Sequence, residues 1–231
     1  MKPTRLLKLF HFVILSLCLS VTAPPPPPVP PIISADQWGS KPLPLPDSAK
    51  HTPKILTIHH AGVLWRPTDE PYAKIRNLQS WGRKEMNWSD LPYHFLISPD
   101  GKIFTGRDIQ YRPESNTQYD LTGVVNIHLW GNFEKQRVSP EQLASLVALT
   151  AHLCHTHGLD PAQIRGHSDA APGQTTCPGR DLQRYIAQGL IQKWTTQSLA
   201  GEMPTIKTLA ALENGPTTQI TTTPPASQPS R

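Results

Sequence analysis

Hydrophobic residues in the middle of the chain follow two spacings, one typical of strands and the other of helices. Apolar runs predict strands at 54–60 and 124–130, and apolar residues at helical spacing predict helices at 70–84, 139–157 and 181–194. Strands that alternate with helices along a chain form a sheet that the helices cover. The pattern therefore predicts the α/β class, with a single domain in which helices flank a central mixed β-sheet.

A short connection refines the predicted sheet. Pro99, Asp100 and Gly101 separate the apolar segments 93–97 and 102–106. Because the sequence Pro-Asp-Gly favours a tight turn, the two segments are predicted to pair as a hairpin.

The helix over 139–157 has the clearest boundaries in the chain. Ser139 is predicted as its N-cap, Pro140 occupies the first helical position, and Gln142 completes a capping box. Gly158 is predicted to end the helix in the left-handed conformation. Cys154 lies on the apolar stripe of this helix, where a small residue suits a core, so we expect its thiol to be buried and free.

The two ends of the chain differ in pattern from the predicted domain, which covers 33–195. Residues 1–23 combine basic residues, an apolar run and small residues, the order of a secretory signal peptide, with an N-terminal membrane anchor as the alternative. Residues 24–32 are proline-rich and predict an extended linker. The tail over 196–231 is expected to be disordered. We therefore expect an exported protein, either secreted or associated with the cell envelope.

Charge narrows the choice of partner only slightly. The net charge of +5 suits an acidic surface such as a cell wall, and it suits solubility equally well. The sequence has no basic stripe with interleaved aromatic residues, so no nucleic-acid partner is expected. We expect a monomer, with a membrane tether through the N-terminus if the anchor is retained.

Two adjacent histidines end the strand at 54–60. Successive side chains of a strand point to opposite faces, so only one of the pair can reach a given site. His60 shares its face with Leu56 and Ile58, which look like core residues, whereas His59 shares its face with Thr57. His59 is therefore the better candidate ligand, and a structural histidine is the alternative.

A third histidine lies in the strand at 124–130. His128 shares a polar face with Asn126, while the neighbouring positions are apolar. If this strand lies beside the one that carries His59, His128 faces the same cleft. The alternative is a hydrogen-bonded histidine of the sheet.

His167 and Cys177 lie at the two ends of a segment that Pro172 and Pro178 prevent from forming a continuous helix or strand. Such a loop can bring both ends to one ion. Zn²⁺ accepts imidazole and thiolate ligands, and three protein ligands leave a fourth position for water. The metal would also keep Cys177 as a thiolate, which gives a reason for a reactive residue in an exposed loop. An oxidising compartment would alternatively permit a disulfide between Cys154 and Cys177.

Five stretches together resemble one known family. They are ISADQWGSKP at 33–42, ILTIHHAG at 55–62, KIRNLQSW at 74–81, DLPYHFLISPDGKIFTGRD at 90–108 and RGHSDAAPGQTTCPG at 165–179. The chain resembles the zinc amidases of peptidoglycan, the type 2 N-acetylmuramoyl-L-alanine amidase family that includes the peptidoglycan recognition proteins. The first and third stretches are most similar to the recognition-protein branch.

The resemblance implies a central mixed sheet and a zinc ion held by His59, His167 and Cys177 at the bottom of a cleft. It also implies that Tyr93 lies beside the metal. The implied activity is hydrolysis of the amide bond between N-acetylmuramic acid and L-alanine, with peptidoglycan or a muropeptide as substrate. In that reaction the metal would activate water, and Tyr93 would stabilise the oxyanion.

Two positions depart from the family pattern. Some members have Glu where this chain has His128, and Lys where it has Thr175. We expect His128 to transfer a proton, since an imidazole with a pKa near neutrality suits that role, and Thr175 to add a hydrogen bond.

Two other functions stay open from the sequence. A module that binds peptidoglycan without hydrolysing it would use the same groove, although loss of the cysteine ligand would be its expected signature. A structural zinc site would need a fourth protein ligand, for which His60, His94 and His128 are the candidates.

Overall fold

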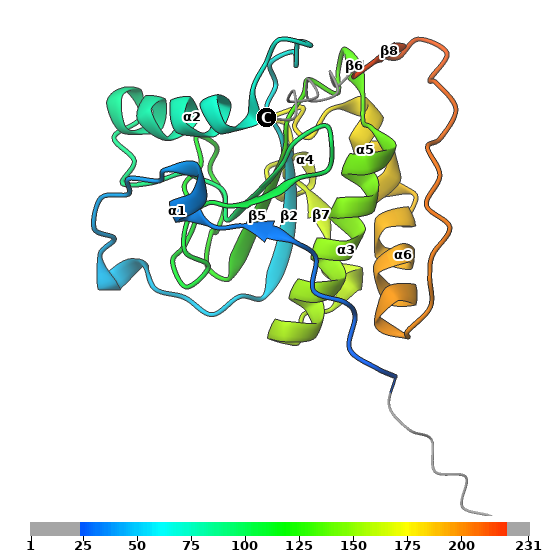
Figure 1. The fold of residues 1–231 in the computed structure, drawn as a ribbon, viewed down its shortest axis with the longest axis horizontal. Coiled ribbons are helices and arrows are strands. Elements are labelled where there is room, and N and C mark those ends of the chain that lie inside the picture. The colour runs from blue at the N-terminus through cyan, green and yellow to red at the C-terminus, as the bar shows by residue number, and fades with distance from the viewer. Residues whose placement is uncertain (1–23, 221–231) are drawn as a thin grey trace, which may run out of the picture.

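A mixed sheet of six strands runs through the centre of the protein, with helices on both sides (Figure 1). The computed structural model describes residues 24–220, and the expected signal peptide or anchor at 1–23 lies outside the described residues. The strand order in the sheet is β1-β4-β3-β5-β2-β7, and β6 pairs with β8 in a separate sheet. The strands are β1 (Ile32–Ile33), β2 (Ile55–His60), β3 (Phe95–Ile97), β4 (Ile103–Thr105), β5 (Val124–Leu129), β6 (Gln136–Arg137), β7 (Arg165–Gly166) and β8 (Thr218–Gln219).

The helices cover the two faces of this sheet unequally. The α-helices are α1 (Ala35–Trp38), α2 (Pro71–Glu85), α3 (Pro140–His157), α4 (His167–Ala170), α5 (Arg180–Ala187) and α6 (Leu190–Leu199), and the 3-10 turns are η1 (Asp47–Ala49) and η2 (Pro161–Gln163). Helices α3, α5 and α6 lie on one side and α2 lies on the other (Figure 1). This arrangement confirms the predicted α/β domain with a mixed sheet flanked by helices. Within the described residues, no helix combines the length and apolar character that crossing a bilayer requires.

The predicted hairpin is present, with two local differences. Strands β3 and β4 pair antiparallel, and the amide of Gly101 donates to the carbonyl of Ser98 at 2.8 Å across the turn. Gly101 has a φ of 80°, a value that glycine adopts without strain. Each strand is shorter than expected, and Tyr93 lies before β3 rather than inside it. The hairpin therefore leaves Tyr93 in a loop at the end of the sheet.

Helix α3 follows the predicted signals. The Ser139 hydroxyl accepts the Gln142 amide at 3.0 Å, and the Gln142 side chain accepts the Ser139 amide at 3.3 Å, so the capping box is complete. Gly158 ends the helix in the left-handed conformation, with φ of 64°. The thiol of Cys154 is buried and free. The helix therefore begins, ends and buries its apolar stripe as its sequence predicts.

The single helix predicted over 181–194 is wrong. The structure has two helices, α5 and α6, separated by Gln188 and Gly189. Gly189 adopts the left-handed conformation, with φ of 69°, which ends one helix and turns the chain into the next. Apolar periodicity continues across this glycine because both helices pack on the same core, and the periodicity therefore hides the break.

The segments on either side of the domain pack against it more than their composition predicts. Helix α6 continues through Leu199, and the chain after it crosses the domain to β8, which pairs with β6. Ile206 and Leu209 pack against the core, and Ile220 is buried. In the proline-rich segment Pro27 and Pro30 are buried. Residues 196–220 thus differ from the disordered tail that was expected, because a few apolar side chains in this segment pack against the domain.

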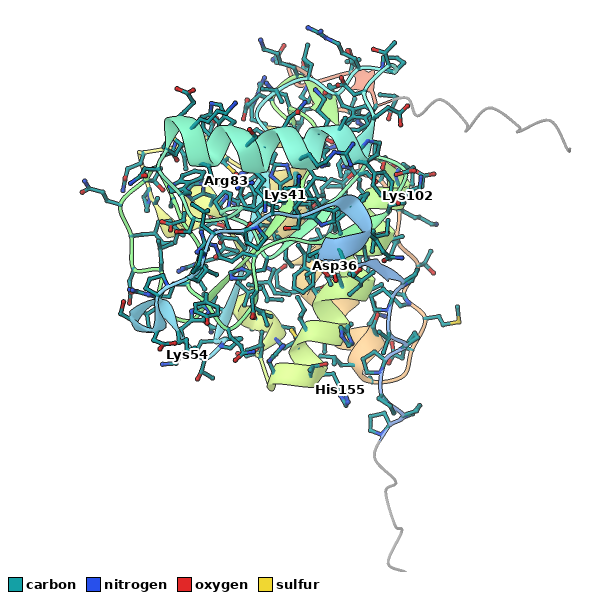
Figure 2. The ribbon with its side chains drawn as sticks, turned by 60° about the vertical axis from the view of Figure 1, so that its left-hand side comes forward. Asp36, Lys41, Lys54, Arg83, Lys102 and His155 are labelled. Atoms are coloured by element: carbon teal, nitrogen blue, oxygen red, sulfur yellow. The ribbon has the colours of Figure 1, made fainter. Side chains whose placement is uncertain are left out.

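Charged side chains lie at separate edges of the domain. Figure 2 places Arg83 on α2, Lys102 beside the β3–β4 turn and Lys54 at the start of β2, well apart from one another. These three basic side chains therefore do not form a single patch.

Candidate metal centre

The centre of the sheet brings two histidines onto one face. Strands β2 and β5 are parallel neighbours, and His59 pairs in register with His128. Residues in register on adjacent strands point to the same face, so both imidazoles project from the side of the sheet that α2 covers. His60 points to the opposite side, where its Nδ1 accepts the Phe133 amide at 3.2 Å. The alternation of side chains in β2 therefore puts His59, and not His60, on the same face as His128.

A two-residue strand carries the next candidate ligand to the same place. In β7, Gly166 pairs with Ile58 of β2, so the following residue, His167, lies next to His59. A side chain at Gly166 would meet the Gln183 amide, since a Cβ there would lie 2.1 Å from its Oε1. The glycine thus permits the close packing that puts His167 beside the sheet.

The loop after His167 returns Cys177 to the same point. The Ser168 amide donates to the Cys177 carbonyl at 2.6 Å, which joins the two ends of the loop. The Cys177 amide donates to the Thr175 hydroxyl at 3.1 Å, and the His60 amide donates to the Cys177 sulfur at 3.4 Å. The loop is exposed at its tip, as expected, whereas Cys177 itself is buried.

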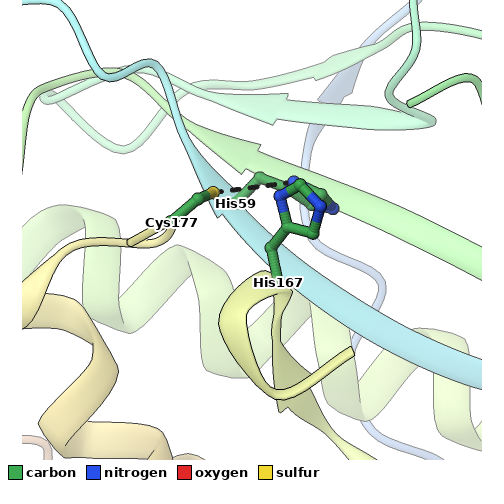
Figure 3. A group of neighbouring side chains, drawn as sticks. All are labelled: His59, His167 and Cys177. Atoms are coloured by element: carbon green, nitrogen blue, oxygen red, sulfur yellow. Dashed lines mark hydrogen bonds between the residues drawn. The ribbon is translucent and has the colours of Figure 1, made fainter. Parts of the chain in front are cut away.

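The three candidate metal ligands converge in a buried cluster. Figure 3 shows the side chains of His59, His167 and Cys177 pointing toward one another from β2, the start of α4 and the loop before α5. One nitrogen or sulfur atom from each residue lies within 4.8 Å of the others. The Cys177 Sγ and His59 Nδ1 are 3.7 Å apart. A tetrahedral zinc ion separates its nitrogen and sulfur ligands by about 3.5 Å, so the donor set fits zinc after a small closure.

Burial shifts the pKa values of all three candidate ligands toward their neutral forms. It lowers the pKa of His59 well below the usual value and the pKa of His167 to about 4, so both rings are neutral near pH 7 and retain a lone pair. Burial also raises the pKa of the Cys177 thiol to about 12. A buried thiol of this kind loses its proton when a cation replaces it.

Two of the three candidates for a fourth protein ligand, His94 and His60, are engaged elsewhere, and the third, His128, lies outside the group with metal-ligand spacing. His94 accepts the Asn126 amide at Nδ1 and contacts the Tyr111 carbonyl at 2.9 Å through Nε2, which occupies both nitrogens. His60 faces the opposite side of the sheet. Among the described residues, the cluster with metal-ligand spacing consists of His59, His167 and Cys177. A zinc ion held by three protein ligands would keep a fourth coordination position for water.

Comparison with known proteins gives the family. The sequence profile described as N-acetylmuramoyl-L-alanine amidase matches residues 49–180. The chain belongs to the N-acetylmuramoyl-L-alanine amidase family. An endolysin of Enterobacteria phage K11 is 32% identical over 120 residues, which cover 50% of this chain and 76% of the endolysin. Peptidoglycan-recognition protein SD of Drosophila simulans is 28% identical over 174 residues, which cover 73% of this chain and 88% of the relative.

Solved structures of the amidase family have the same fold. Drosophila peptidoglycan recognition protein SD has a TM-score of 0.60 and 26% identity, and the match covers 68% of this chain and 94% of the solved one. The N-acetylmuramoyl-L-alanine amidase LysC from Clostridium intestinale has a TM-score of 0.55 and 25% identity, and the match covers 69% of this chain and 97% of LysC. The relatives thus include both amidases and recognition proteins.

The region matched by the amidase family also contains the residues beside the metal cluster. The ring of Tyr93 lies 5.2 Å from that of His59 and 4.4 Å from that of His128, measured between centroids. Tyr93 and His128 line a pocket of about 320 Å³, together with Trp130 and with Trp81 of α2. The cluster therefore adjoins an aromatic groove between the sheet and α2.

Burial shifts the pKa values of Tyr93 and His128, the two groove residues nearest the cluster, in opposite directions. Burial raises the pKa of Tyr93, so its phenol stays protonated and can donate a hydrogen bond at neutral pH. Burial lowers the pKa of His128 to about 3, which corrects the expectation of a value near neutrality. Within the described chain, neither ring nitrogen of His128 has a hydrogen-bond partner. His128 is thus a neutral imidazole with one donor and one acceptor available to a ligand.

Two residues that no sequence pattern indicates lie against His167. Thr117 and Tyr119 lie in the irregular segment between β4 and β5, and the Thr117 hydroxyl lies 2.6 Å from His167 Nε2. The Tyr119 ring centroid lies 5.5 Å from that of His167. No periodicity or spacing marks these residues, because a loop reaches a site through the path of the chain rather than through a repeating pattern.

Proposed function

We propose that the protein is a zinc-dependent amidase that hydrolyses the amide bond between N-acetylmuramic acid and L-alanine in peptidoglycan. One observation carries this proposal: His59, His167 and Cys177 converge in a buried cluster beside Tyr93, at the edge of the groove. Membership of the amidase family and similarity to an endolysin support the substrate and the reaction. The ligand set of three, with no fourth protein ligand in the described cluster, supports a catalytic zinc ion.

The residues of the site have different proposed roles in the reaction, according to where they lie. Zinc, when bound by His59, His167 and Cys177, supplies Lewis acidity for the amide carbonyl and lowers the pKa of a water nucleophile. Tyr93 donates a hydrogen bond from its phenol to the oxygen that gains charge during attack. The phenol is protonated at neutral pH, and burial raises its pKa further, so it keeps its proton throughout the reaction.

Two further side chains serve the substrate. Because burial lowers its pKa to about 3, His128 acts as a neutral relay: one free ring nitrogen accepts a proton while the other donates its proton to the leaving amine, so the ring does not become a cation. The Thr175 hydroxyl accepts the Cys177 amide and retains its own proton, which it donates to a polar group of the substrate. Thr175 therefore has two roles: its oxygen holds the backbone of the loop at Cys177, and its proton binds the substrate.

Product analysis tests the proposed activity. Purified protein loaded with zinc is incubated with peptidoglycan, and the soluble products are separated and sequenced. The proposal requires stem peptides with a free N-terminal L-alanine, together with glycan strands that carry an unsubstituted lactyl carboxylate. Chelation should abolish this release and added zinc should restore it. No release by the fully zinc-loaded protein would refute the enzyme proposal.

The recognition-protein relatives favour a second candidate, binding of peptidoglycan without hydrolysis. The aromatic groove beside the cluster would hold the muropeptide in either case. Sedimentation of the protein with peptidoglycan, followed by analysis of the stem peptides, separates the two candidates. Stable binding with every stem peptide intact would favour a binding module.

We propose export as the cellular context, on the basis of the basic, apolar and small-residue order of 1–23. Fractionation of cells that express the full chain tests this proposal. Recovery of the protein outside the cytoplasm, either free or bound to the envelope, is the expected result. A wholly cytoplasmic protein would contradict it.

A further inference from the structure

We propose that Thr117 is a positioning residue that holds the metal ligand His167 in the tautomer and orientation required for zinc binding. The inference rests on the zinc centre proposed above. Its starting point is the distance of 2.6 Å between the Thr117 Oγ1 and His167 Nε2. Because Nε2 is engaged by this hydroxyl, Nδ1 is the nitrogen that remains to bind a metal. Metal-binding histidines generally donate the N–H of their second nitrogen to an oxygen atom, which fixes the ring.

A second hydroxyl, that of Ser115, lies within hydrogen-bond distance of Thr117. The Ser115 Oγ lies 2.9 Å from the Thr117 Oγ1 and accepts the Thr117 amide at 3.1 Å. A neutral imidazole with its lone pair on Nδ1 carries its proton on Nε2. That N–H donates to the Thr117 oxygen, and the Thr117 hydroxyl then donates to Ser115. All three groups keep a partner when a metal ion binds to Nδ1.

The loop that carries Thr117 is attached directly to the loop that carries the ligands. The Gln118 amide donates to the Gln174 Oε1 at 2.8 Å, and the Gln174 Nε2 donates to the Gln118 carbonyl at 2.9 Å. Gln174 lies between His167 and Cys177 in the chain. These two hydrogen bonds fix the position of the Thr117 hydroxyl relative to His167. A ligand held in place by a hydrogen-bonded neighbour is ordered in advance, which strengthens metal binding.

Zinc affinity is the direct test, because it does not depend on amidase activity. Competition with a chromophoric chelator gives the zinc dissociation constants of the wild type, Thr117→Val and Thr117→Ser. Valine keeps the size of threonine and lacks the hydroxyl, so we expect zinc binding about 10–100-fold weaker. Serine keeps the hydroxyl and should bind zinc nearly as well as the wild type. Thr117→Ala replaces the valine variant if the latter does not fold.

A matched control and a spectroscopic measurement separate positioning from general stability. Gln118→Ala alters the exposed side chain next to Thr117 and keeps both backbone hydrogen bonds, so its zinc affinity should be unchanged. Nitrogen-15 NMR of the zinc-loaded wild type should show the His167 proton on Nε2. In Thr117→Val this signal should broaden or shift, because the ring loses its acceptor.

The outcomes distinguish this inference from the proposed function. Equal zinc affinity in the wild type and Thr117→Val would overturn the inference and leave the amidase proposal intact. Equally weak binding by Thr117→Ser and Thr117→Val would also overturn it, because the hydroxyl would then not be the cause. A wild type that binds zinc without hydrolysing peptidoglycan would refute the amidase proposal, and the hydroxyl-dependent loss of affinity would still stand.

Discussion

His59 on β2 and His128 on β5 are register partners in a parallel pair of strands, so their imidazoles project from the same face of the sheet. The two residues have different surroundings despite this equivalence. His59 lies against His167, with 4.4 Å between ring centroids, whereas His128 packs against Tyr93 at the same separation and lines the groove. One strand thus contributes to the candidate metal cluster, and its neighbour contributes to the adjoining aromatic groove.

Replacement of His128 should therefore impair catalysis without loss of zinc. His128→Phe keeps ring contacts with Tyr93 and Trp130 and removes both nitrogens. Because a positioned proton-transfer group contributes about 10²–10⁴-fold, we expect kcat to fall by at least 10²-fold. His128→Gln keeps a donor and an acceptor and should retain more activity. Zinc content and steady-state kinetics check this prediction, and full activity of the phenylalanine variant would contradict it.

Removal of the Tyr93 hydroxyl should lower the rate of hydrolysis alone. Tyr93→Phe keeps the ring beside His59 and His128 and removes the donor to the oxyanion. Loss of one such donor costs about 10²–10³-fold in kcat. Tyr72→Phe is the matched control, since Tyr72 is partly exposed and packs against Phe104. Comparable kcat values for the Tyr93 variant and the wild type would rule out the proposed donor.

Replacing Cys177 should abolish zinc binding, whereas replacing Cys154, the other cysteine of the domain, should leave zinc binding unchanged. Cys177→Ala removes a ligand from the cluster and should lose both stoichiometric zinc and activity. Cys154→Ala alters a buried thiol of α3 outside the cluster and should retain both. Elemental analysis after dialysis, together with the peptidoglycan assay, measures the difference. An active Cys177→Ala protein would show that the ligand assignment is incorrect.

His94 should make the folded state sensitive to acid. Burial lowers the pKa of His94 to about 3, below the usual value of 6.5. Between these two pH values the His94 side chain is protonated in the unfolded chain and neutral in the folded one. The stabilising contribution is complete above pH 6.5 and decreases as the pH falls toward 3. For this group alone, about 2 kcal/mol of unfolding free energy should be lost between pH 7 and pH 5.

The variant His94→Gln isolates this contribution. Unfolding by urea in the presence of chelator should give a smaller loss of stability between pH 7 and pH 5 for the variant than for the wild type. His155→Gln serves as the control because its side chain is exposed. Identical losses in the wild type and His94→Gln would exclude the proposed linkage.

A buried carboxylate should be important for the attachment of α5. Asp181 is fully buried, accepts the Val138 amide at 2.9 Å and pairs with Arg184 at 2.6 Å. Asp181→Ala leaves buried partners without compensation, so we expect a loss of about 3–5 kcal/mol of unfolding free energy. Asp47→Ala breaks an exposed pair with Lys50 and should cost under about 1 kcal/mol. Urea titrations compare the two, and equal small losses would contradict the prediction.

Local sequence determined much of this protein because its signals act over a few residues. The alternation of side chains in β2 separates His59 from His60, and the capping box at Ser139 sets the start of α3. Pro99, Asp100 and Gly101 determine the turn of the hairpin. Each of these outcomes follows from backbone geometry and hydrogen bonds between near neighbours in the chain.

Tertiary structure alone decided which distant residues meet. The register of β2 with β5 and β7 brings His128 and His167 beside His59, and the path of a loop brings Thr117 to His167. These relationships arise from packing and pairing between segments far apart in the chain, whose free energies depend on the whole fold. Local periodicity is the same whichever segments become neighbours, so it cannot specify them.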